Sequence, residues 1–137
     1  MEKSIKIEYL DHVAIRVKDL DLSAKWYEKV LGLKKYKLKE LGEFPIIMLS
    51  NKSGVALFLA NTNDESINQH SRNVKIDHFT FNVNKENFKK AILKYEELGL
   101  EFQIQDHYYF DSIYTKDRDG HIVELTTIKV DEKTFYK

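Results

Sequence analysis

Several features are missing from this sequence, and each absence excludes a class of protein. The 137 residues include no cysteine, which excludes a disulfide scaffold and a thiol nucleophile and favours a cytoplasmic location. Lys+Arg and Asp+Glu both number 22, so the neutral chain has no basic cluster for nucleic acid. No run of about 18 apolar residues is present, and residues 1–10 lack the apolar centre of a signal peptide, so we expect no membrane association.

The residues that are present predict a folded domain. The chain is 42% hydrophobic and 12% aromatic, which is enough for a core and unlike a disordered chain. A length of 137 residues suits one ordinary domain or two small modules packed together.

The chain contains a repeated stretch. Residues 9–17 read "YLDHVAIRV" and residues 75–83 read "KIDHFTFNV", each with Asp-His at the start of an alternating, strand-like run. His12 and His78 lie 66 positions apart (78 − 12), and so do Val17 and Val83 (83 − 17). A fixed offset between matched landmarks indicates an internal duplication.

Each repeated run precedes a helical pattern and then three strand-like runs. The first helix is expected within 19–32, with Asp21 as cap, Gly32 as end and an apolar stripe of Trp26, Tyr27, Val30 and Leu31. The second is expected within 84–99, with Asn84 as cap, Gly99 as end and a stripe of Phe88, Ile92, Tyr95 and Leu98. The strand-like runs are 34–40, 44–50 and 54–60, and then 101–106, 109–116 and 120–128.

This order predicts an α+β fold made of two βαβββ modules in a single domain, 1–137. Module one covers about 8–60 and module two about 74–128, separated by a polar connector, 61–73, and followed by a charged, loosely attached tail, 129–137. In the last runs, "GVALFLA" and "GHIVELT" also match at the 66-residue offset.

Three polar residues fall on the mixed-polarity faces of their strands. Strand side chains alternate between faces, which places His12, His78 and Glu124 opposite the uniformly apolar faces that helices would cover. A buried carboxylate is costly without a partner, and two imidazoles with one carboxylate suit a divalent Fe, Mn, Ni, Co or Zn ion. The sequence therefore predicts a metal site with open positions for substrate.

The sequence resembles the vicinal oxygen chelate superfamily over about residues 8–128. The resemblance is carried by "LDHVAIRVKDLDLSAKWYEKVLGL", "IDHFTFNV" and "SIYTKDRDGHIVEL". It implies a cupped mixed sheet with helices on its outer face and the metal ligands His12, His78 and Glu124. It also implies Lewis-acid chemistry on a small substrate chelated through two oxygens.

The resemblance leaves the subclass open between a ring-cleaving dioxygenase and a glyoxalase-like lyase or isomerase. Glyoxalase I uses a fourth ligand in the first module, but the 66-residue offset places Phe58 opposite Glu124 in the repeat (124 − 66), and Phe cannot ligate. Resemblance to dioxygenases gives Tyr114 and His107 as acid–base residues. His70 and His121 are expected to be solvated.

Two alternatives and one assembly remain open in the resemblance. A fosfomycin-type thiol transferase is the first, although these usually carry Thr where this chain has Ala14. The second is a metal-free bleomycin-type binding protein with an aromatic groove, for which the candidates are Phe44, Phe58, Tyr108, Tyr109 and Phe110. Exposed sheet edges favour a homodimer, whose copies could share the metal ligands.

Overall fold

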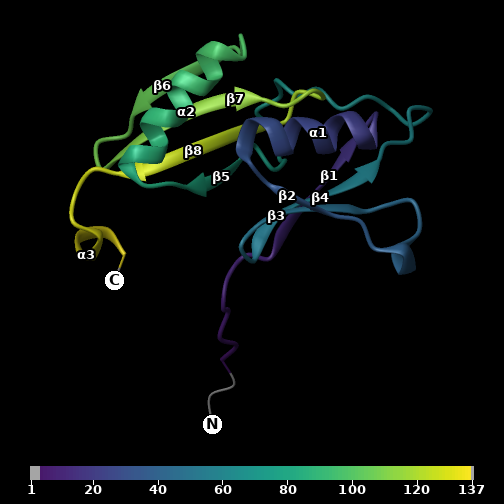
Figure 1. Ribbon diagram of the computed structural model, residues 1–137, viewed down its shortest axis with the longest axis horizontal. Coiled ribbons are helices and arrows are strands. Elements are labelled where there is room, and N and C mark those ends of the chain that lie inside the picture. The colour runs from purple at the N-terminus through teal and green to yellow at the C-terminus, as the bar shows by residue number, and fades with distance from the viewer. Residues whose placement is uncertain (1–3, 137) are drawn as a thin grey trace. The chain divides into compact units, whose positions relative to one another are not determined.

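The computed structural model describes residues 4–136 and divides into two compact units, one ending at Ser66 and the other beginning at Ile67 (Figure 1). The two units repeat one order of elements: a strand, a helix and three strands. Within the described part of the chain, no helix has the length and apolar character needed to cross a membrane.

The first unit contains four strands, one α-helix and a short 3₁₀-helix. They are β1 (His12–Val17), α1 (Leu20–Leu31), β2 (Lys34–Tyr36), η1 (Lys39–Leu41), β3 (Ile46–Ser50) and β4 (Ser53–Leu59). Strand β2 is shorter than the expected run 34–40, because η1 begins at Lys39.

The second unit contains four strands and two helices. They are β5 (Phe79–Asn82), α2 (Lys85–Glu97), β6 (Phe102–Asp106), β7 (Phe110–Lys116), β8 (Ile122–Ile128) and the short α3 (Glu132–Phe135). The tail contacts the second unit through α3, which brings Phe135 to 4.8 Å from Phe110 between ring centroids.

The two sheets have the same topology. Their strand orders are β1-β4-β3-β2 and β5-β8-β7-β6, with the first pair of each parallel and the others antiparallel. Helix α1 packs on β3 and β4, and α2 packs on β8, so each helix covers its own sheet. The α+β class and the two βαβββ modules are therefore confirmed.

Helix ends follow local rules, with one correction to the sequence analysis. The cap of α1 is Asp19, whose side chain accepts a hydrogen bond from Leu22 N at 2.9 Å, and the expected cap Asp21 lies in the first turn. Asn84 caps α2 as expected, accepting from Asn87 N at 2.8 Å. Gly32 ends α1 in the left-handed conformation at φ +68°, which glycine adopts at low cost.

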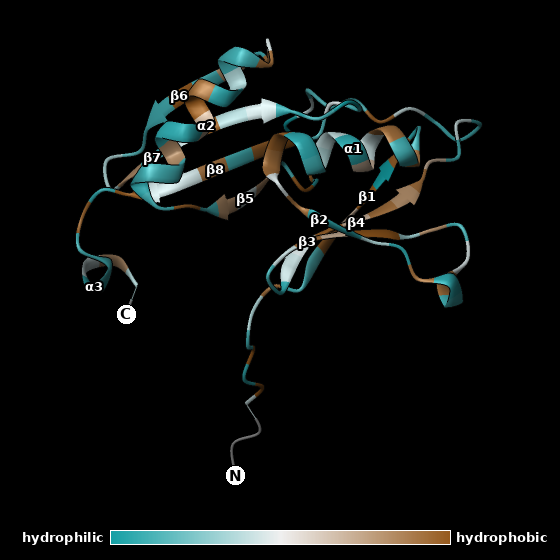
Figure 2. Ribbon diagram, in the orientation of Figure 1, coloured by the Kyte–Doolittle hydropathy of each residue, from teal (hydrophilic) through white to brown (hydrophobic). Residues whose placement is uncertain are grey.

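The strands alternate as their sequences predict. Ile15 and Val17 on β1 are buried while His12 and Arg16 are exposed, and Figure 2 shows apolar and polar residues interleaved along the strands and helices. On the helices that cover these sheets, Tyr27 of α1 and Tyr95 of α2 are fully buried. Each sheet is thus left with a second face that its own helix does not cover.

The turn between β7 and β8 is a compact polar motif. The carboxylate of Asp117 accepts hydrogen bonds from the backbone N–H of Asp119 and of His121, both at 2.9 Å, and its second oxygen lies 2.8 Å from His121 Nδ1. The expectation of a solvated His121 is therefore wrong. Burial lowers the pKa of His121, but the Asp117 contact outweighs it and raises that pKa above its ordinary value.

Candidate functional site

The uncovered face of the second sheet carries its polar side chains in rows. Strand pairing places Thr80 of β5 opposite Glu124 of β8, Glu124 opposite Tyr114 of β7, and Tyr114 opposite Gln103 of β6. Residues opposite one another across a sheet point to the same face. One row therefore gathers a hydroxyl, a carboxylate, a phenol and an amide, at the opposite face from Val123 and Leu125.

Glu124 is a buried acid with a full set of partners. Its side chain is 9% exposed, and its Oε1 accepts a hydrogen bond from Thr80 Oγ1 at 2.7 Å and lies 3.0 Å from His78 Nε2. Burial raises the pKa of Glu124, but hydrogen bonds from Ser112, Thr80 and Tyr114 and the attraction of His78 outweigh it. The pKa is lowered overall, so the carboxyl is ionised at neutral pH.

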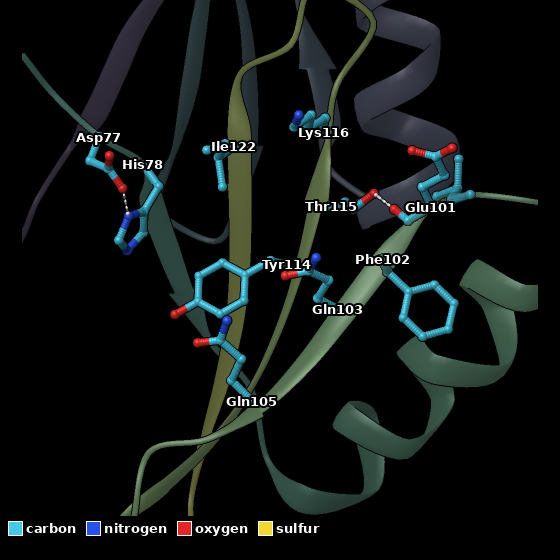
Figure 3. Close-up of a pocket in the computed structure, with 11 residues that line it drawn as sticks. Asp77, His78, Glu101, Phe102, Gln103, Gln105, Tyr114, Thr115, Lys116 and Ile122 are labelled. Atoms are coloured by element: carbon cyan, nitrogen blue, oxygen red, sulfur yellow. Dashed lines mark hydrogen bonds and ion pairs between the residues drawn. The ribbon is translucent and has the colours of Figure 1, made fainter. Parts of the chain in front are cut away.

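His78 is oriented by the residue before it in the sequence. Its Nδ1 lies 2.9 Å from Asp77 Oδ2, as the dashed line in Figure 3 shows, and its Nε2 points to Glu124. The hydrogen bond from His78 lowers the pKa of Asp77. The Asp77 carboxylate on Nδ1 orients the ring so that Nε2 faces Glu124, an arrangement in which a histidine can ligate a metal ion through Nε2.

The first unit repeats this Asp-His arrangement. His12 Nδ1 lies 2.8 Å from Asp11 Oδ1, at the start of β1. In both units the carboxylate of the preceding aspartate therefore lies against Nδ1 of the histidine. His12 belongs to the first unit, whereas His78 and Glu124 are brought together in the second.

Tyr114 and His107, the two expected acid–base residues, are in contact. His107 Nε2 lies 2.8 Å from Tyr114 Oη, and the Tyr114 ring meets the His78 ring edge-on at 5.7 Å between centroids. Burial raises the pKa of Tyr114, and the negative charge of Glu124 raises it further. The phenol is therefore protonated at neutral pH and can act as a hydrogen-bond donor or an acid.

A cavity of about 710 Å³ opens beside these residues. His78 and Tyr114 line it together with Gln103, Gln105 and Lys116 (Figure 3). The last three residues were not predicted from the sequence. Alternation along β6 and β7 carries the signal, because Gln103 and Gln105 share a face and Lys116 lies two residues after Tyr114.

The donors in the second unit fit part of a divalent metal site. Two donors bound at about 2.1 Å from one ion, at about a right angle, lie roughly 3 Å apart. The separation of His78 Nε2 and Glu124 Oε1 is 3.0 Å. Among residues 4–136, however, neither unit by itself gathers three His, Asp or Glu side chains that could hold a metal ion.

The strand register corrects the repeat partner of Glu124. Thr80 pairs with Glu124 in the second unit, and its counterpart Ala14 pairs with Ala56 in the first. The residue equivalent to Glu124 is therefore Ala56, and Phe58 is wrong by two positions. Phe58 lies opposite Arg16, whose guanidinium sits 5.2 Å from its ring centroid. Alanine cannot ligate either, so this position of the first module offers no carboxylate.

The aromatic residues considered for a binding groove fall into different units. Phe44 and Phe58 stack edge-on at 6.0 Å in the first unit. Tyr109 and Phe110 pack with Phe135 of the C-terminal segment in the second, at 6.3 and 4.8 Å. Neither unit by itself assembles the whole aromatic set.

Comparison with known proteins places this geometry in a family. The profile of the Glyoxalase/Bleomycin resistance protein/Dioxygenase superfamily matches residues 9–125. A glyoxalase/dioxygenase from Nostoc punctiforme has a similar fold, at a TM-score of 0.77 and 17% identity, over 95% of this chain and 100% of that one. The lactoylglutathione lyase of Agrobacterium tumefaciens (TM-score 0.69, 19% identity, 88% and 94% covered) is similar as well.

The fosfomycin resistance protein FosX of Mesorhizobium loti is a further structural relative. Its TM-score is 0.64 at 23% identity, over 94% of this chain and 99% of that one. These identities show a shared fold, while the profile covers most of the chain. The chain therefore belongs to the Glyoxalase/Bleomycin resistance protein/Dioxygenase superfamily.

Proposed function

We propose that the chain is a metal-dependent enzyme acting on a small substrate that presents two neighbouring oxygens. The observation that carries the proposal is the 3.0 Å approach of His78 Nε2 to the ionised Glu124, with Asp77 fixing the other ring nitrogen. His78, Glu124 and His12 would hold a divalent Fe, Mn, Ni, Co or Zn ion. When bound, such an ion supplies Lewis-acid polarisation of substrate oxygens.

Tyr114 and His107 would handle the proton. Tyr114 is protonated at neutral pH and faces the cavity, so it can donate a hydrogen bond or a proton to a substrate oxygen. His107, at 2.8 Å from the phenol oxygen, can hold the phenol in position or return the proton. Proton transfer of this kind serves ring cleavage and lyase or isomerase chemistry alike.

The cavity wall favours a polar, partly anionic substrate. Gln103 and Gln105 offer amide donors and acceptors, and Lys116 is a cation whose side chain has no hydrogen bond or ion pair to residues 4–136. Lys116 lies opposite Ile122, and both side chains line the cavity together with His78. A substrate carboxylate or phenolate held at Lys116 would lie on the same sheet face as the candidate ligands.

The absence of a carboxylate at position 56 narrows the chemistry. In glyoxalase I, paired carboxylates act as bases in proton transfer. Ala56 cannot serve as the second carboxylate of such a pair. A three-residue His, His, Glu set with a tyrosine acid suits a dioxygenase, or a lyase or isomerase that needs one base. A homodimer is part of the proposal, since the outer strands β2 and β6 each have an unpaired edge within their own unit.

Metal binding tests the proposal. His78→Ala and Glu124→Ala should each weaken the binding of Co²⁺, Ni²⁺ or Zn²⁺ by about 10-fold or more, because each removes a direct ligand. Calorimetric titration of chelator-treated protein gives the affinities. His70→Ala is the matched control, because His70 is an exposed histidine of the connector. This variant should bind metal as tightly as the natural chain does.

The competing outcome is a His78–Glu124 ion pair in a metal-free binding protein. In that case His78→Ala would lower the free energy of unfolding but leave metal affinity unchanged, and the proposal would be wrong. Metal analysis of protein purified without chelator then separates the subclasses. Iron favours ring cleavage, and nickel, cobalt or zinc favours a lyase or isomerase.

A further inference from the structure

The hairpin between β6 and β7 ends in an unusual turn. Tyr109 N donates a hydrogen bond to His107 O at 2.8 Å, which closes a three-residue turn around Tyr108. Tyr108 has φ +71°, the left-handed region that residues with a side chain rarely adopt. A γ-turn with positive φ at its centre is rare and strained, and such strain persists only where the surroundings enforce it.

The ring of Tyr108 does little to offset this strain, since the residue is 79% exposed. The polar support comes from two neighbours. Asp106 Oδ1 accepts from Tyr108 N at 2.8 Å and from Lys129 Nζ at 3.0 Å. Lys129 N also donates to Tyr109 O at 2.8 Å, so the residue that follows β8 is bonded to both sides of the turn.

The apolar support comes from the C-terminal segment, residues 131–136. The ring of Phe135 meets Phe110 at 4.8 Å and 89°, and lies 6.3 Å from the ring of Tyr109. Tyr136 adds a contact to Phe110 at 6.2 Å. Asp131 caps the short helix that carries these rings, accepting from Lys133 N at 2.9 Å.

The turn carries His107. Its backbone N–H donates to Phe110 O at 2.8 Å, and its Nε2 reaches Tyr114 Oη at 2.8 Å. Phe135 thus contacts the rings of Tyr109 and Phe110, and the backbone of each is hydrogen-bonded to His107. We propose that residues 131–136 form a clamp, with Phe135 as a positioning residue, that holds the strained turn and keeps His107 on Tyr114.

The proposal that the clamp positions His107 does not depend on the proposed function. Only the expected effect of the clamp on catalysis rests on that function. The test therefore begins with the full-length, metal-free protein carrying ¹⁵N-labelled histidine. The ring resonances of His107, assigned by their loss in His107→Gln, report its contact with Tyr114. Hydrogen exchange of the Tyr109 and Lys129 amides reports closure of the turn.

Phe135→Ala should move the His107 ring resonances to the positions of a solvated histidine. It should speed exchange of the two turn amides by about 10-fold or more, with the Leu125 amide of β8 unchanged. Phe135→Leu should restore both signals in large part, because it keeps an apolar contact with Phe110. Tyr108→Gly, which removes the strain, should shrink the response to Phe135→Ala.

Unchanged His107 resonances and turn exchange in Phe135→Ala would overturn the clamp, and so would failure of Phe135→Leu to restore them. In a metal-loaded, active enzyme Phe135→Ala should lower kcat with KM and metal affinity unchanged, because none of its ring contacts is to His78 or Glu124. If the metal titrations fail while His107 still responds to Phe135, the clamp is supported and only the proposed function falls.

Discussion

At the scale of single residues, Glu124 combines deep burial with a retained charge. Burial acting alone would raise the pKa of Glu124, because desolvation disfavours the charged form. The hydroxyl groups of Ser112, Thr80 and Tyr114 and the imidazole of His78 reverse that preference. The protein's own groups therefore hold Glu124 as an anion at neutral pH.

The stability of the protein in acid should report this lowered pKa of Glu124. The pKa of Glu124 in the folded chain lies below its ordinary value of 4.5, so its contribution to stability is present above pH 4.5 and is lost as the pH falls through the folded pKa. Glu124→Gln removes the titrating group. Its free energy of unfolding, measured by urea denaturation of metal-free protein, should therefore fall less steeply than that of the natural chain below pH 4.5.

An exposed acid gives the control for this comparison. Glu86 lies on α2 with its carboxylate largely in solvent, 3.5 Å from Lys90 Nζ. Glu86→Gln should keep the slope of the natural chain, since exposed pairs contribute little. Equal slopes for Glu124→Gln and the natural chain would show that Glu124 titrates alike in the folded and unfolded chain.

At the scale of elements, the repeat is regular in topology but not in spacing. His12 and His78 are 66 positions apart, Ile47 and Tyr114 are 67 apart (114 − 47), and Ala56 and Glu124 are 68 apart (124 − 56). The increase from 67 to 68 arises in the turn before the last strand of each unit. Residues 117–121 of the second unit correspond to residues 50–53 of the first and include one residue more.

This spacing explains which predictions from the sequence succeeded. Helix caps, apolar stripes and strand alternation are local, so Asn84, Gly32 and the buried face of β1 could be read directly. Register between strands depends on loop length, and matching Gly54 to Gly120 ignored the longer turn. Partners such as Thr80 and Gln103 could not be assigned, because each becomes a neighbour of the site only through pairing across strands.

The register makes a prediction about the first sheet. Ala56→Glu should lower the free energy of unfolding by about 2 kcal/mol or more, because Ala56 is 1% exposed and the new carboxylate lacks donors. Adding Ala14→Thr should recover about 1 kcal/mol, since the introduced threonine would stand to the introduced glutamate as Thr80 stands to Glu124. Urea denaturation of the single and double variants measures this coupling.

Phe58→Glu serves as the comparison variant, because it lies two residues along the same strand, opposite Arg16. Its effect should add to that of Ala14→Thr without coupling. Coupling of Ala14→Thr with Phe58→Glu in place of Ala56→Glu would restore the register that the 66-residue offset predicted.

At the scale of the whole molecule, the two units contribute unequally to the proposed chemistry. The second unit holds His78, Glu124, Tyr114 and His107 in direct contact, yet within residues 4–136 neither unit alone assembles three metal-binding side chains. Protein metal sites that keep positions open for substrate generally use three protein ligands. A tight site therefore requires one donor from outside the second unit.

His12 is the best candidate for that donor. Its Nδ1 is engaged by Asp11 at 2.8 Å, as His78 is by Asp77, and its Nε2 has no hydrogen-bond partner among residues 4–136. His12→Ala should therefore weaken Co²⁺ or Zn²⁺ binding by about 10-fold or more, close to the loss in His78→Ala. Calorimetric titration of the two variants beside His70→Ala makes the comparison.

Mixing the variants then shows which chain supplies the donor. If copies share sites, a refolded mixture of His12→Ala and His78→Ala chains forms some sites with both natural histidines, and its metal binding exceeds that of either variant alone. If each chain completes its own site, the mixture binds no better than its components. Both interpretations of the mixture apply only where His12→Ala alone loses metal affinity. A His12→Ala affinity equal to that of His70→Ala contradicts His12 as a ligand, because the second unit would then bind metal without the first.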